Sequence, residues 1–306
     1  MKKDSFLSNT WKHRSHLLMC IPAVLILFLF SYMPIFGLVG AFKDFKTKLG
    51  LWNSPWCGFE NFKFLIASGS IFKRITLNTL KYYFIFTILG TFLNIVLAIS
   101  IDQFMFKRVG KVMQSIMIIP VFISFAAVTF IVNAFLSSGG IINHIITSFG
   151  GQTISWYTSP KYWTTILTIV KIWNSVGYGS VLYMSVLAGI DTQLYEAAQI
   201  DGANKWQQIW HITIPSLIPM ITIMLLLSVG GIMRSDTGLF YQVTRNTGGL
   251  YSTTQVIDSY VLHSIKTEPK LGYSMAASLF QSVVGLVLIL IANYTVKKIS
   301  PEDSLF

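Results

Sequence analysis

Six stretches of this 306-residue chain are long, apolar and almost free of charged side chains. A helix of about 20 mostly apolar residues can cross the hydrocarbon core of a bilayer, where it satisfies its own backbone hydrogen bonds. The chain is 53% hydrophobic and 11% charged, which is too few charges for a water-soluble surface. The pattern therefore predicts an all-α integral membrane bundle, with spans at residues 17–42, 82–101 (extending back toward Arg74), 112–136, 162–190, 216–233 and 271–296.

The first run follows several basic residues, as the apolar core of a signal peptide does. Residues 17–42 exceed the ~7–15 residues of such a core, so we expect an uncleaved first span. The net charge of +11 does not indicate nucleic acid, because the basic residues lie beside apolar runs, as membrane-flanking residues do. Cys20 lies near the start of the first run and Cys57 beyond its end, so we expect two free thiols.

With six spans, both termini lie on one side of the membrane. The density of basic residues, above all Lys107, Arg108 and Lys111, favours cytoplasmic termini, although only weakly. We expect a cytoplasmic segment at 1–16, a six-span domain at 17–297 and a cytoplasmic tail at 298–306. The outer connections are then 43–73, 137–161 and 234–270. Their aromatic residues either anchor the protein at the membrane interface or form a docking surface for an external partner.

The connection between the fourth and fifth runs, residues 191–215, has a helical pattern that Gly202 interrupts. Apolar side chains recur at helical spacing on both sides of this glycine, at Leu194, Ala197 and Ala198 before it and at Trp206, Ile209 and Trp210 after it. The pattern predicts two short amphipathic helices, with Gly202 in a positive-φ conformation or close backbone approach between them. Pro215 suits the first turn of the next helix. Small alanines on such a helix suit burial in a groove of another protein.

This segment resembles the Glu-Ala-Ala signature of the permease subunits of binding-protein-dependent ABC importers. The family pattern is Glu-Ala-Ala, three residues, Gly, nine residues and Ile-x-Leu-Pro. The positions that match at this spacing are Glu196, Ala197, Ala198, Gly202, Ile212 and Pro215, whereas Ile214 stands where leucine is usual. Asp201, Ala203 and Trp206 are similar to the carbohydrate branch of the family.

The resemblance extends over nearly the whole chain and is closest to the subgroup that handles complex oligosaccharides and polysaccharides. Similar motifs lie at 32–37, 41–44, 56–62, 78–80, 256–261 and 279–282. Cys57 departs from this pattern, because an apolar residue is common at that position.

The resemblance implies a six-helix type I ABC importer permease with a cytoplasmic coupling helix, in a bacterial cell membrane with both termini cytoplasmic. It implies that residues 191–215, called the coupling segment below, dock into a cleft of a cytoplasmic ATPase. Glu196 would pair with a basic group of that ATPase or cap its own helix. The implied partners are a second permease, related or identical, two ATPase subunits, an external sugar-binding protein, an oligosaccharide and membrane lipid.

The sequence contains no phosphate-binding loop for ATP. Val109-Gly110-Lys111-Val112 lacks both the upstream glycine and the hydroxyl residue of that motif. We therefore expect ATP and Mg²⁺ on a separate subunit. For this chain we expect no enzymatic activity and neither a cofactor nor a catalytic or metal site.

Polar side chains within the fourth run mark a candidate substrate path. Lys171 lies about 14 Å into the run at about 1.5 Å per residue, and Asn174 and Tyr178 share its helical face, with Trp173 nearby. Intramembrane polar groups usually face the bundle interior or a watery path, and sugars are bound by hydrogen bonds and aromatic stacking. The alternative role is hydrogen bonding between helices, with Lys171 reaching the interface.

A weaker candidate group for the path is Asn78, Lys81 and Tyr82, near the outer end of the second run. Lys81 has the alternative of simply reaching the interface. Gln281 and Asn293 in the last run are expected to join helices by hydrogen bonds.

Two other function classes compete with the importer. An ion-gradient-driven secondary transporter of a small polar solute would favour carboxylates inside spans, but Asp102, Asp191 and Asp236 all lie at span ends. A membrane-embedded enzyme would need paired carboxylates, a Ser-His arrangement or metal spacing, and no span contains these. Which sugar moves, and whether the permease pairs with a copy of itself, stays open at the level of sequence.

Overall fold

The computed structural model describes residues 14–67, 69–103, 107–267 and 271–305. Every regular element in these ranges is a helix, and an isolated antiparallel bridge joins Lys43 to Trp56. The all-α prediction is confirmed. The chain divides into two compact units, Met1–Ala67 with Pro269–Leu279, and Ser68–Glu268 with Phe280–Phe306. Of the N-terminal segment expected at 1–16, residues 1–13 lie outside the described residues and the rest begin the first helix.

The first unit contains the first predicted span. α2 (Arg14–Leu27), the π-helical segment η1 (Phe28–Tyr32) and the 3-10 segment η2 (Met33–Phe42) follow one another directly. Leu18–Phe42 is long and apolar enough to cross a membrane, and its apolar window is not buried within the chain. The short helices α3 (Gly50–Asn53) and α4 (Glu60–Ala67) follow, and α15 (Leu271–Ile299) begins in this unit. Cys20 is exposed, Cys57 is half-buried, and both are free thiols.

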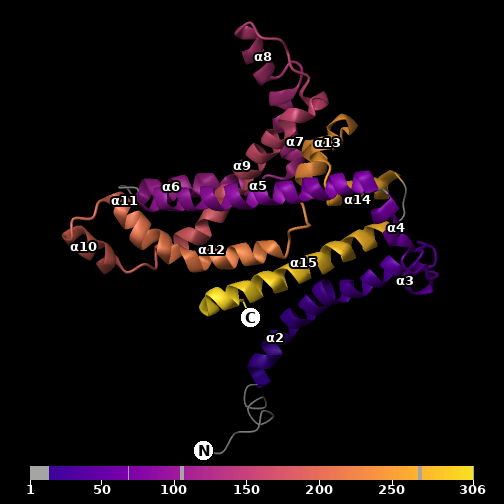
Figure 1. Cartoon of the computed structure of the whole chain (residues 1–306), viewed down its shortest axis with the longest axis horizontal. Helices are drawn as coiled ribbons and strands as arrows, with labels where there is room; N and C mark the ends of the chain where they lie inside the picture. The colour runs from indigo at the N-terminus through magenta and orange to yellow at the C-terminus, as the bar shows by residue number, and fades with distance from the viewer. Residues whose placement is uncertain (1–13, 68, 104–106, 268–270, 306) are drawn as a thin grey trace, which may run out of the picture. The chain divides into compact units, whose positions relative to one another are not determined.

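The second unit contains the helices that carry the candidate sites (Figure 1). In chain order they are α5 (Gly69–Asp102), α6 (Lys107–Ile118), η3 (Ile119–Phe122), α7 (Phe125–Leu136), α8 (Ile141–Ser148), η4 (Trp156–Thr158), η5 (Pro160–Tyr162), α9 (Trp163–Leu187), α10 (Thr192–Ile200), α11 (Lys205–Gln208), η6 (Ile209–Thr213), α12 (Ile214–Val229), η7 (Gly238–Val243), η8 (Gly248–Leu250), α13 (Tyr251–Thr254), α14 (Ile257–Thr267), most of α15, and η9 (Pro301–Asp303). α9 packs along α5 and also contacts α6, α12 and η7, so it is the central helix of this unit.

Five helical stretches among the described residues are long and apolar enough to span a membrane: Leu18–Phe42, Gly69–Asp102, Phe125–Ser148, Lys205–Val229 and Leu271–Ile299. The fourth predicted run forms α9, which is not in this set. With 25 residues, α9 is about 37 Å long and could cross, but its polar side chains lower its hydropathy. α9 contacts α5, α6, α12 and η7, so buried polar side chains such as Asn174 meet protein, whereas Trp173 and Tyr178 are exposed.

The third predicted run, 112–136, is not one helix. α6 ends at Ile118, Pro120 lies in the short 3-10 segment η3, and α7 begins after Ser124. Proline cannot donate a backbone hydrogen bond, which interrupts the helical ladder. Ser124 then caps the new helix, because its hydroxyl accepts from the backbone N–H of Ala127 at 3.4 Å. Apolar periodicity could not show this break, since residues on both sides of it are apolar.

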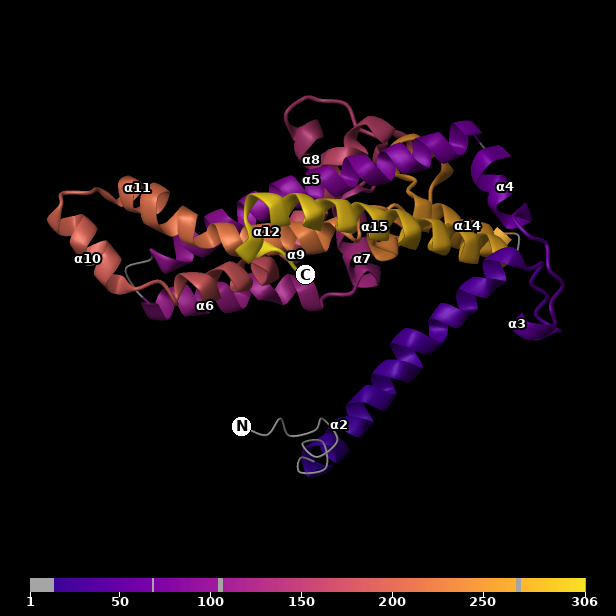
Figure 2. The same cartoon turned by 60° about the horizontal axis from the view of Figure 1, so that its bottom comes forward.

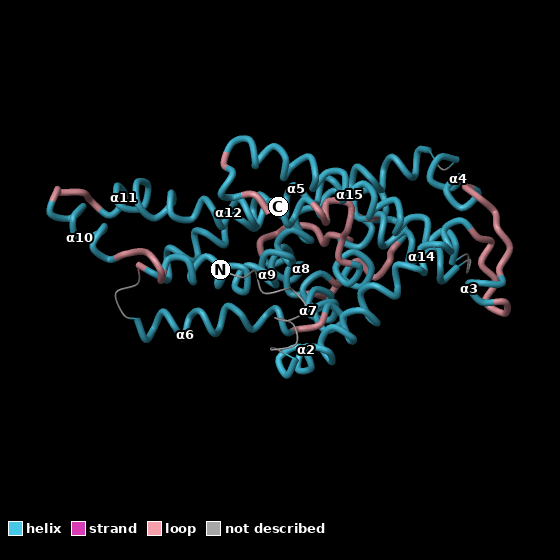
Figure 3. Tube along the Cα trace, turned by 90° about the horizontal axis from the view of Figure 1, so that it is seen from below, coloured by secondary structure: helices cyan, strands magenta, loops and turns pink. Residues whose placement is uncertain are grey.

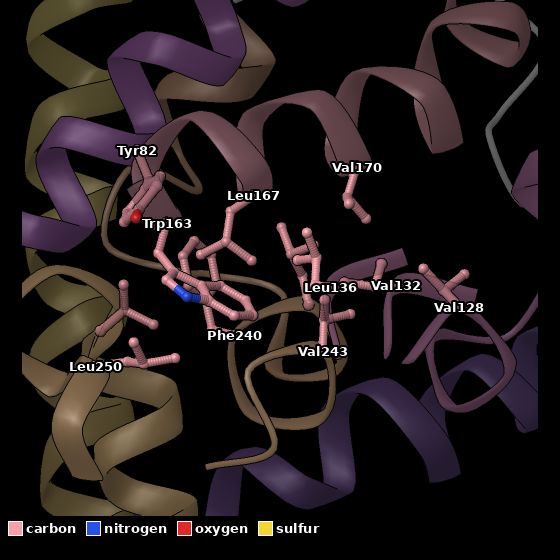
Figure 4. Packing of buried hydrophobic residues seen from close by; sticks show 12 residues of the cluster. Tyr82, Val128, Val132, Leu136, Trp163, Leu167, Val170, Phe240, Val243 and Leu250 are labelled. Atoms are coloured by element: carbon pink, nitrogen blue, oxygen red, sulfur yellow. The ribbon is translucent and has the colours of Figure 1, made fainter. Parts of the chain in front are cut away.

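A cluster of buried apolar side chains joins α5, α7, α9 and η7 (Figure 4). Trp163 is fully buried in it, beside Leu167 and Phe240, and its indole Nε1 donates to the carbonyl of Trp156 at 2.8 Å. Helices in lipid associate through close packing and hydrogen bonds rather than through the hydrophobic effect. Close packing is also visible where α9 meets α6: a Cβ at Gly177 would overlap the carbonyl oxygen of Met117.

Candidate functional site

The coupling segment lies at one end of the second unit, and α13 and α14 lie at the other (Figures 1 and 2). Its first half is α10, and a short loop separates α10 from α11 (Figure 3). Asp191 caps the start of α10, because its carboxylate Oδ1 accepts from the backbone N–H of Gln193 at 2.9 Å. A carboxylate at this position satisfies a free N–H group and interacts favourably with the positive end of the helix dipole.

The turn at Gly202 follows the end of α10 at Ile200, so the helical pattern breaks at Gly202 as the sequence predicts. Gly202 has a φ of 79°, the left-handed conformation that favours glycine. Its N–H donates to the carbonyl of Gln199 at 3.1 Å, and the N–H of Ala203 donates to the carbonyl of Ala198 at 2.8 Å. These two bonds form a Schellman motif, which satisfies carbonyls at the end of a helix and reverses the chain direction.

The second half of the coupling segment is not a separate short helix. Lys205–Val229 is one helical stretch, in which α11, η6 and α12 follow one another. A capping box starts it: Asn204 Oδ1 accepts from the backbone N–H of Gln207 at 3.0 Å, and Gln207 Oε1 accepts from the backbone N–H of Asn204 at 2.8 Å. The fifth span therefore begins well before the predicted residue 216 and includes the part of the coupling segment after Gly202.

Pro215 explains the irregular turn inside that helix. It is the second residue of α12, and η6 immediately before it is π-helical, with the N–H of Ile214 donating to the carbonyl of Ile209. A proline within a helix lacks an N–H and crowds the carbonyl one turn earlier. A π-helical turn widens the ladder at that place, so the helix continues through Pro215.

α10 is connected to the fifth span by side-chain hydrogen bonds. The hydroxyls of Tyr195 in α10 and Thr213 in η6 lie 2.9 Å apart. Thr213 is fully buried, and Gln208 nearby donates from Nε2 to the carbonyl of Ala203 at 3.3 Å. Any force on α10 would therefore reach the base of the fifth span through these contacts.

The coupling segment also has large apolar side chains that are exposed. Four large side chains, called the docking face below, are more than half exposed: Leu194, Ile200, Trp206 and Trp210. Glu196 is exposed beside them and forms no ion pair with the described residues. Clustered exposed apolar side chains usually mark a surface that another protein or a membrane covers.

Lys171 forms an ion pair with Asp236. Its Nζ lies 3.6 Å from Asp236 Oδ2, and both side chains are about one-third exposed. The other carboxylate oxygen of Asp236 accepts from the backbone N–H groups of Gly238 and Leu239, at 3.0 and 3.4 Å, which starts η7. Sequence reasoning placed Asp236 at a span end but not beside Lys171, because the two residues lie on different elements.

The other predicted path residues of α9 lie in different environments. Asn174 is buried and donates from Nδ2 to the carbonyl of Pro120 at 2.8 Å, so it joins α9 to η3. Trp173 and Tyr178 are 43% and 59% exposed. Tyr178 lines a pocket of about 290 Å³ between α5, α9 and α12, in which Asn94 has a buried Oδ1 without a hydrogen-bond partner among the described residues.

The second group of predicted path residues forms bonds within the protein. Asn78 Nδ2 donates to the carbonyls of Ser252 and Gln255 at 3.2 and 3.0 Å, and the hydroxyl of Tyr82 donates to the carbonyl of Thr253 at 3.0 Å. These bonds fix α13 against α5. Lys81 donates from Nζ to Thr164 Oγ1 at 3.1 Å.

A polar network that sequence reasoning missed is centred on Asp258 in α14. Its Oδ2 accepts from the backbone N–H and the hydroxyl of Ser235, both at 2.7 Å. Gln281 in α15 donates from Nε2 to Asp258 Oδ1 at 3.2 Å and to the carbonyl of Met233 at 2.7 Å. Gln281 thus joins elements as predicted, and one of its partners is Asp258. Nothing in the local sequence around Asp258 indicates this role.

A family model described as "Binding-protein-dependent transport system inner membrane component" matches residues 87–301, which include the coupling segment and the fourth to sixth runs. Two similar proteins come from Bacillus subtilis (strain 168). Protein LplB is 32% identical over 93% of this chain and 89% of its own length. The polygalacturonan/rhamnogalacturonan transport system permease protein YteP is 30% identical over 93% of this chain and 88% of its own.

Solved structures of a bacterial ABC transporter involved in the import of the acidic polysaccharide alginate contain a similar chain. In one of them the similar chain has a TM-score of 0.85 and 29% identity, over 97% of this chain and 100% of the other. In the other, a complex with an alginate pentasaccharide-bound periplasmic protein, the TM-score is 0.85 and the identity 28%, over 97% and 99%.

Proposed function

This chain belongs to the family of binding-protein-dependent transport system inner membrane components, and from that membership we propose that it forms half of the translocation path of an ATP-driven oligosaccharide importer. The family is a membrane-spanning transport component and not an enzyme. The observation that carries the proposal is the coupling segment, whose glycine-terminated helix is hydrogen-bonded to the fifth span and presents an apolar docking face. A carbohydrate cargo is supported by the polygalacturonan permease and the alginate importer, both similar to this chain.

The proposed partners supply what this chain lacks. Two cytoplasmic ATPase subunits bind ATP and Mg²⁺, and a second permease, related or identical, completes the path. An external binding protein delivers the sugar, which is supported by the periplasmic protein in the alginate transporter complex. Because the coupling segment meets the ATPase, both termini are cytoplasmic and the connections at 137–161 and 234–270 face outward.

The coupling segment acts as a lever in this proposal. ATP binds the closed ATPase pair better than the open one and so shifts a two-state equilibrium. The docking face moves with the ATPase, with Glu196, Ala197, Ala198 and Asp201 at the contact. The Tyr195–Thr213 bond then passes the movement to the helix that contains Ile212 and Pro215.

The substrate passes along α9 in this proposal. Tyr178 and the pocket between α5, α9 and α12 offer hydroxyl and amide groups to a sugar, and the exposed ring of Trp173 offers a stacking surface. Lys171 contributes positive charge that Asp236 partly neutralises. Asn78, Lys81, Tyr82 and Asn174 support the shape of the path through the bonds described above. The ion-gradient alternative is not favoured by the family match.

Photo-crosslinking tests the contact with the ATPase. A benzophenone amino acid replaces Trp206 or Ile200 on the docking face, and Phe149, which is 88% exposed after α8, is the matched control. In native membranes, the probes at Trp206 and Ile200 should give light-dependent adducts between the full-length chain and an ATPase that has a phosphate-binding loop. Mass spectrometry identifies the adducts. Adducts from Phe149 alone, or none from the docking face, would refute the coupling role.

A further inference from the structure

A pocket of about 320 Å³ lies among the end of α7, residues 154–158 and Arg245. We call it the outer pocket. Its lining combines hydroxyl groups, the aromatic residues Trp156 and Tyr157, and the guanidinium of Arg245, and none of its lining residues carries a carboxylate. Neither the coupling segment nor the predicted path residues contribute to it.

The walls of the outer pocket are held by one buried side chain, Asn143, which is 1% exposed. Its Nδ2 donates to the carbonyls of Ser137, Ser138 and Ile154, at 3.1, 3.3 and 3.0 Å. Its Oδ1 accepts from the backbone N–H of Ile154 at 3.0 Å and from the indole Nε1 of Trp156 at 3.2 Å. Two loop segments are thereby fixed against each other, so the pocket is built before any ligand arrives.

Arg245 enters this pocket from an unusual backbone conformation. Arg245 and the following Asn246 have φ values of 54° and 47°. Asparagine tolerates the left-handed region, but arginine is strained there and glycine would adopt the same backbone conformation without strain. Strained residues of this kind occur preferentially at ligand-binding sites, where the side chain is needed in one place.

The guanidinium of Arg245 is positioned but not neutralised. Its Nη1 donates to Asn133 Oδ1 at 3.2 Å, and its Cζ lies 5.6 Å from the centre of the Tyr157 ring. Burial raises the pKa of Tyr157 while the Arg245 charge acts in the opposite direction, so this phenol stays neutral at physiological pH. No carboxylate among the described residues forms an ion pair with Arg245. Its remaining N–H donors are available to an anion.

We propose that the outer pocket is a subsite for a uronate residue of an acidic oligosaccharide. The carboxylate of the sugar binds the guanidinium of Arg245, a geometry in which arginine forms two parallel hydrogen bonds. The rings of Trp156 and Tyr157 contact the apolar face of the sugar, and the hydroxyls of Ser138 and Ser155 meet its hydroxyl groups. This inference rests on the proposed function, which places the outer pocket on the side where the binding protein delivers its cargo.

A sugar fits the outer pocket better than an acidic side chain of a partner protein. A protein carboxylate would need only the cation. The pocket adds several hydroxyl groups and two aromatic rings around that cation, which is the combination by which proteins bind carbohydrates. The similarity to permeases for polygalacturonan and alginate is consistent with an acidic cargo.

Equilibrium binding to the full-length chain in lipid nanodiscs tests the subsite without any ATPase. The probe is trigalacturonate, and its methyl ester is the neutral counterpart of the same shape. We expect wild-type protein to bind trigalacturonate at least about ten-fold more tightly than the ester, as for the loss of a charge-assisted hydrogen bond. Arg245→Gln should remove this preference, and Arg245→Lys should keep only part of it.

Arg234→Gln is the matched control, because it removes one positive charge from the same outer connection, and Arg234 does not line the pocket. It should change trigalacturonate affinity less than two-fold. Arg245→Gly controls for misfolding, because glycine fits the positive φ at this position. This variant should keep the gel-filtration profile of the wild type but lose the preference for the acid over the ester. An equal effect of Arg234→Gln, or equal affinity for acid and ester, would overturn the subsite.

Binding-protein docking separates the remaining interpretation. If Arg245→Gln weakens docking of the binding protein but leaves trigalacturonate affinity unchanged, the pocket receives a protein carboxylate and the sugar subsite is wrong. The coupling role is tested independently by the crosslinks at Trp206 and Ile200. A chain that crosslinks to the ATPase but shows no Arg245-dependent binding would refute only the subsite.

Discussion

Gly202 has a positive φ and nothing lies within 4 Å of the place where a Cβ would stand. Any cost of replacing it therefore comes from the backbone alone and not from a clash. The Schellman bonds at Gln199 and Ala198 depend on that backbone conformation. A single residue thus determines where α10 ends and in which direction the chain continues toward the fifth span.

Gly202→Ala should destabilise the end of α10 by about 1 kcal/mol, because L-residues pay roughly that amount in the left-handed region. Gly202→Asn should cost much less, since asparagine tolerates this conformation. Hydrogen exchange in nanodiscs measures the effect: amides of residues 192–203 should exchange faster in the alanine variant, and those of α5 should not change. If the alanine variant exchanged these amides as slowly as the wild type, the positive φ would not be needed.

Lys171 and Asp236 form the second feature that belongs to the residue scale. The pair is about one-third exposed, so its net contribution lies between that of a surface ion pair and a buried one. Asp236 also starts η7 through two backbone N–H groups. Exchanging the two charges would therefore not restore the site, because lysine cannot accept those hydrogen bonds.

A double-mutant cycle with Lys171→Met and Asp236→Asn isolates the charge interaction, since asparagine can still cap η7. We expect a coupling energy of about 1 kcal/mol. The double variant should therefore lose about that much less stability than the sum of the losses in the two single variants. Thermal unfolding in detergent provides the measurement. A coupling energy near zero would mean that the two charges do not interact, and Lys171 would then be available in full to the substrate.

At the scale of elements, close contact between α6 and α9 depends on a small residue. A Cβ at Gly177 would overlap the backbone carbonyl of Met117, which cannot move like a side chain. Gly90 in α5 provides a contrast, because nothing lies within 4 Å of its Cβ position. Small residues allow helix backbones to approach in membranes, whereas a glycine without a neighbour only lowers helix stability.

Gly177→Ala should separate α6 from α9 and destabilise the protein by about 1–3 kcal/mol, the range for overpacked sites. Gly90→Ala should be neutral or should stabilise by up to about 1 kcal/mol through helix propensity. The melting temperatures of the two variants in the same detergent test this difference. If Gly177→Ala melts at or above the wild-type temperature, α6 and α9 are less tightly packed than described.

At the scale of the molecule, the second unit separates its two proposed contacts. The docking face lies at the α10 end, and α13 and α14 lie at the other end of the unit (Figure 1). α5, with 34 residues, and the continuous Lys205–Val229 stretch extend between these regions. Long helices transmit displacement better than loops do, which suits the importer proposed above, in which the ATPase and the delivered sugar lie on opposite sides of the membrane.

The sequence by itself determined the helical class, the positions of the first, second and sixth spans and the helix end at Gly202. These features depend on local rules: apolar length sets a span, and a glycine between two periodic stretches sets a helix end. For Gly202 the sequence left a positive φ or a close backbone approach open, and the structure has the positive φ with no atom close to the glycine. The break at Pro120 and Ser124 was also locally encoded, but the surrounding apolar residues concealed it.

Only the tertiary structure decided which polar groups meet. Lys171 pairs with Asp236, Asn78 supports α13, and Arg245 reaches a pocket that Asn143 holds open, and in each case the partners belong to different elements. Hydrogen bonds and ion pairs act over a few ångströms, so their formation depends on how helices pack, which local periodicity does not specify. Long helices could thus be predicted from the chain, whereas the contacts between polar side chains of different helices required the fold.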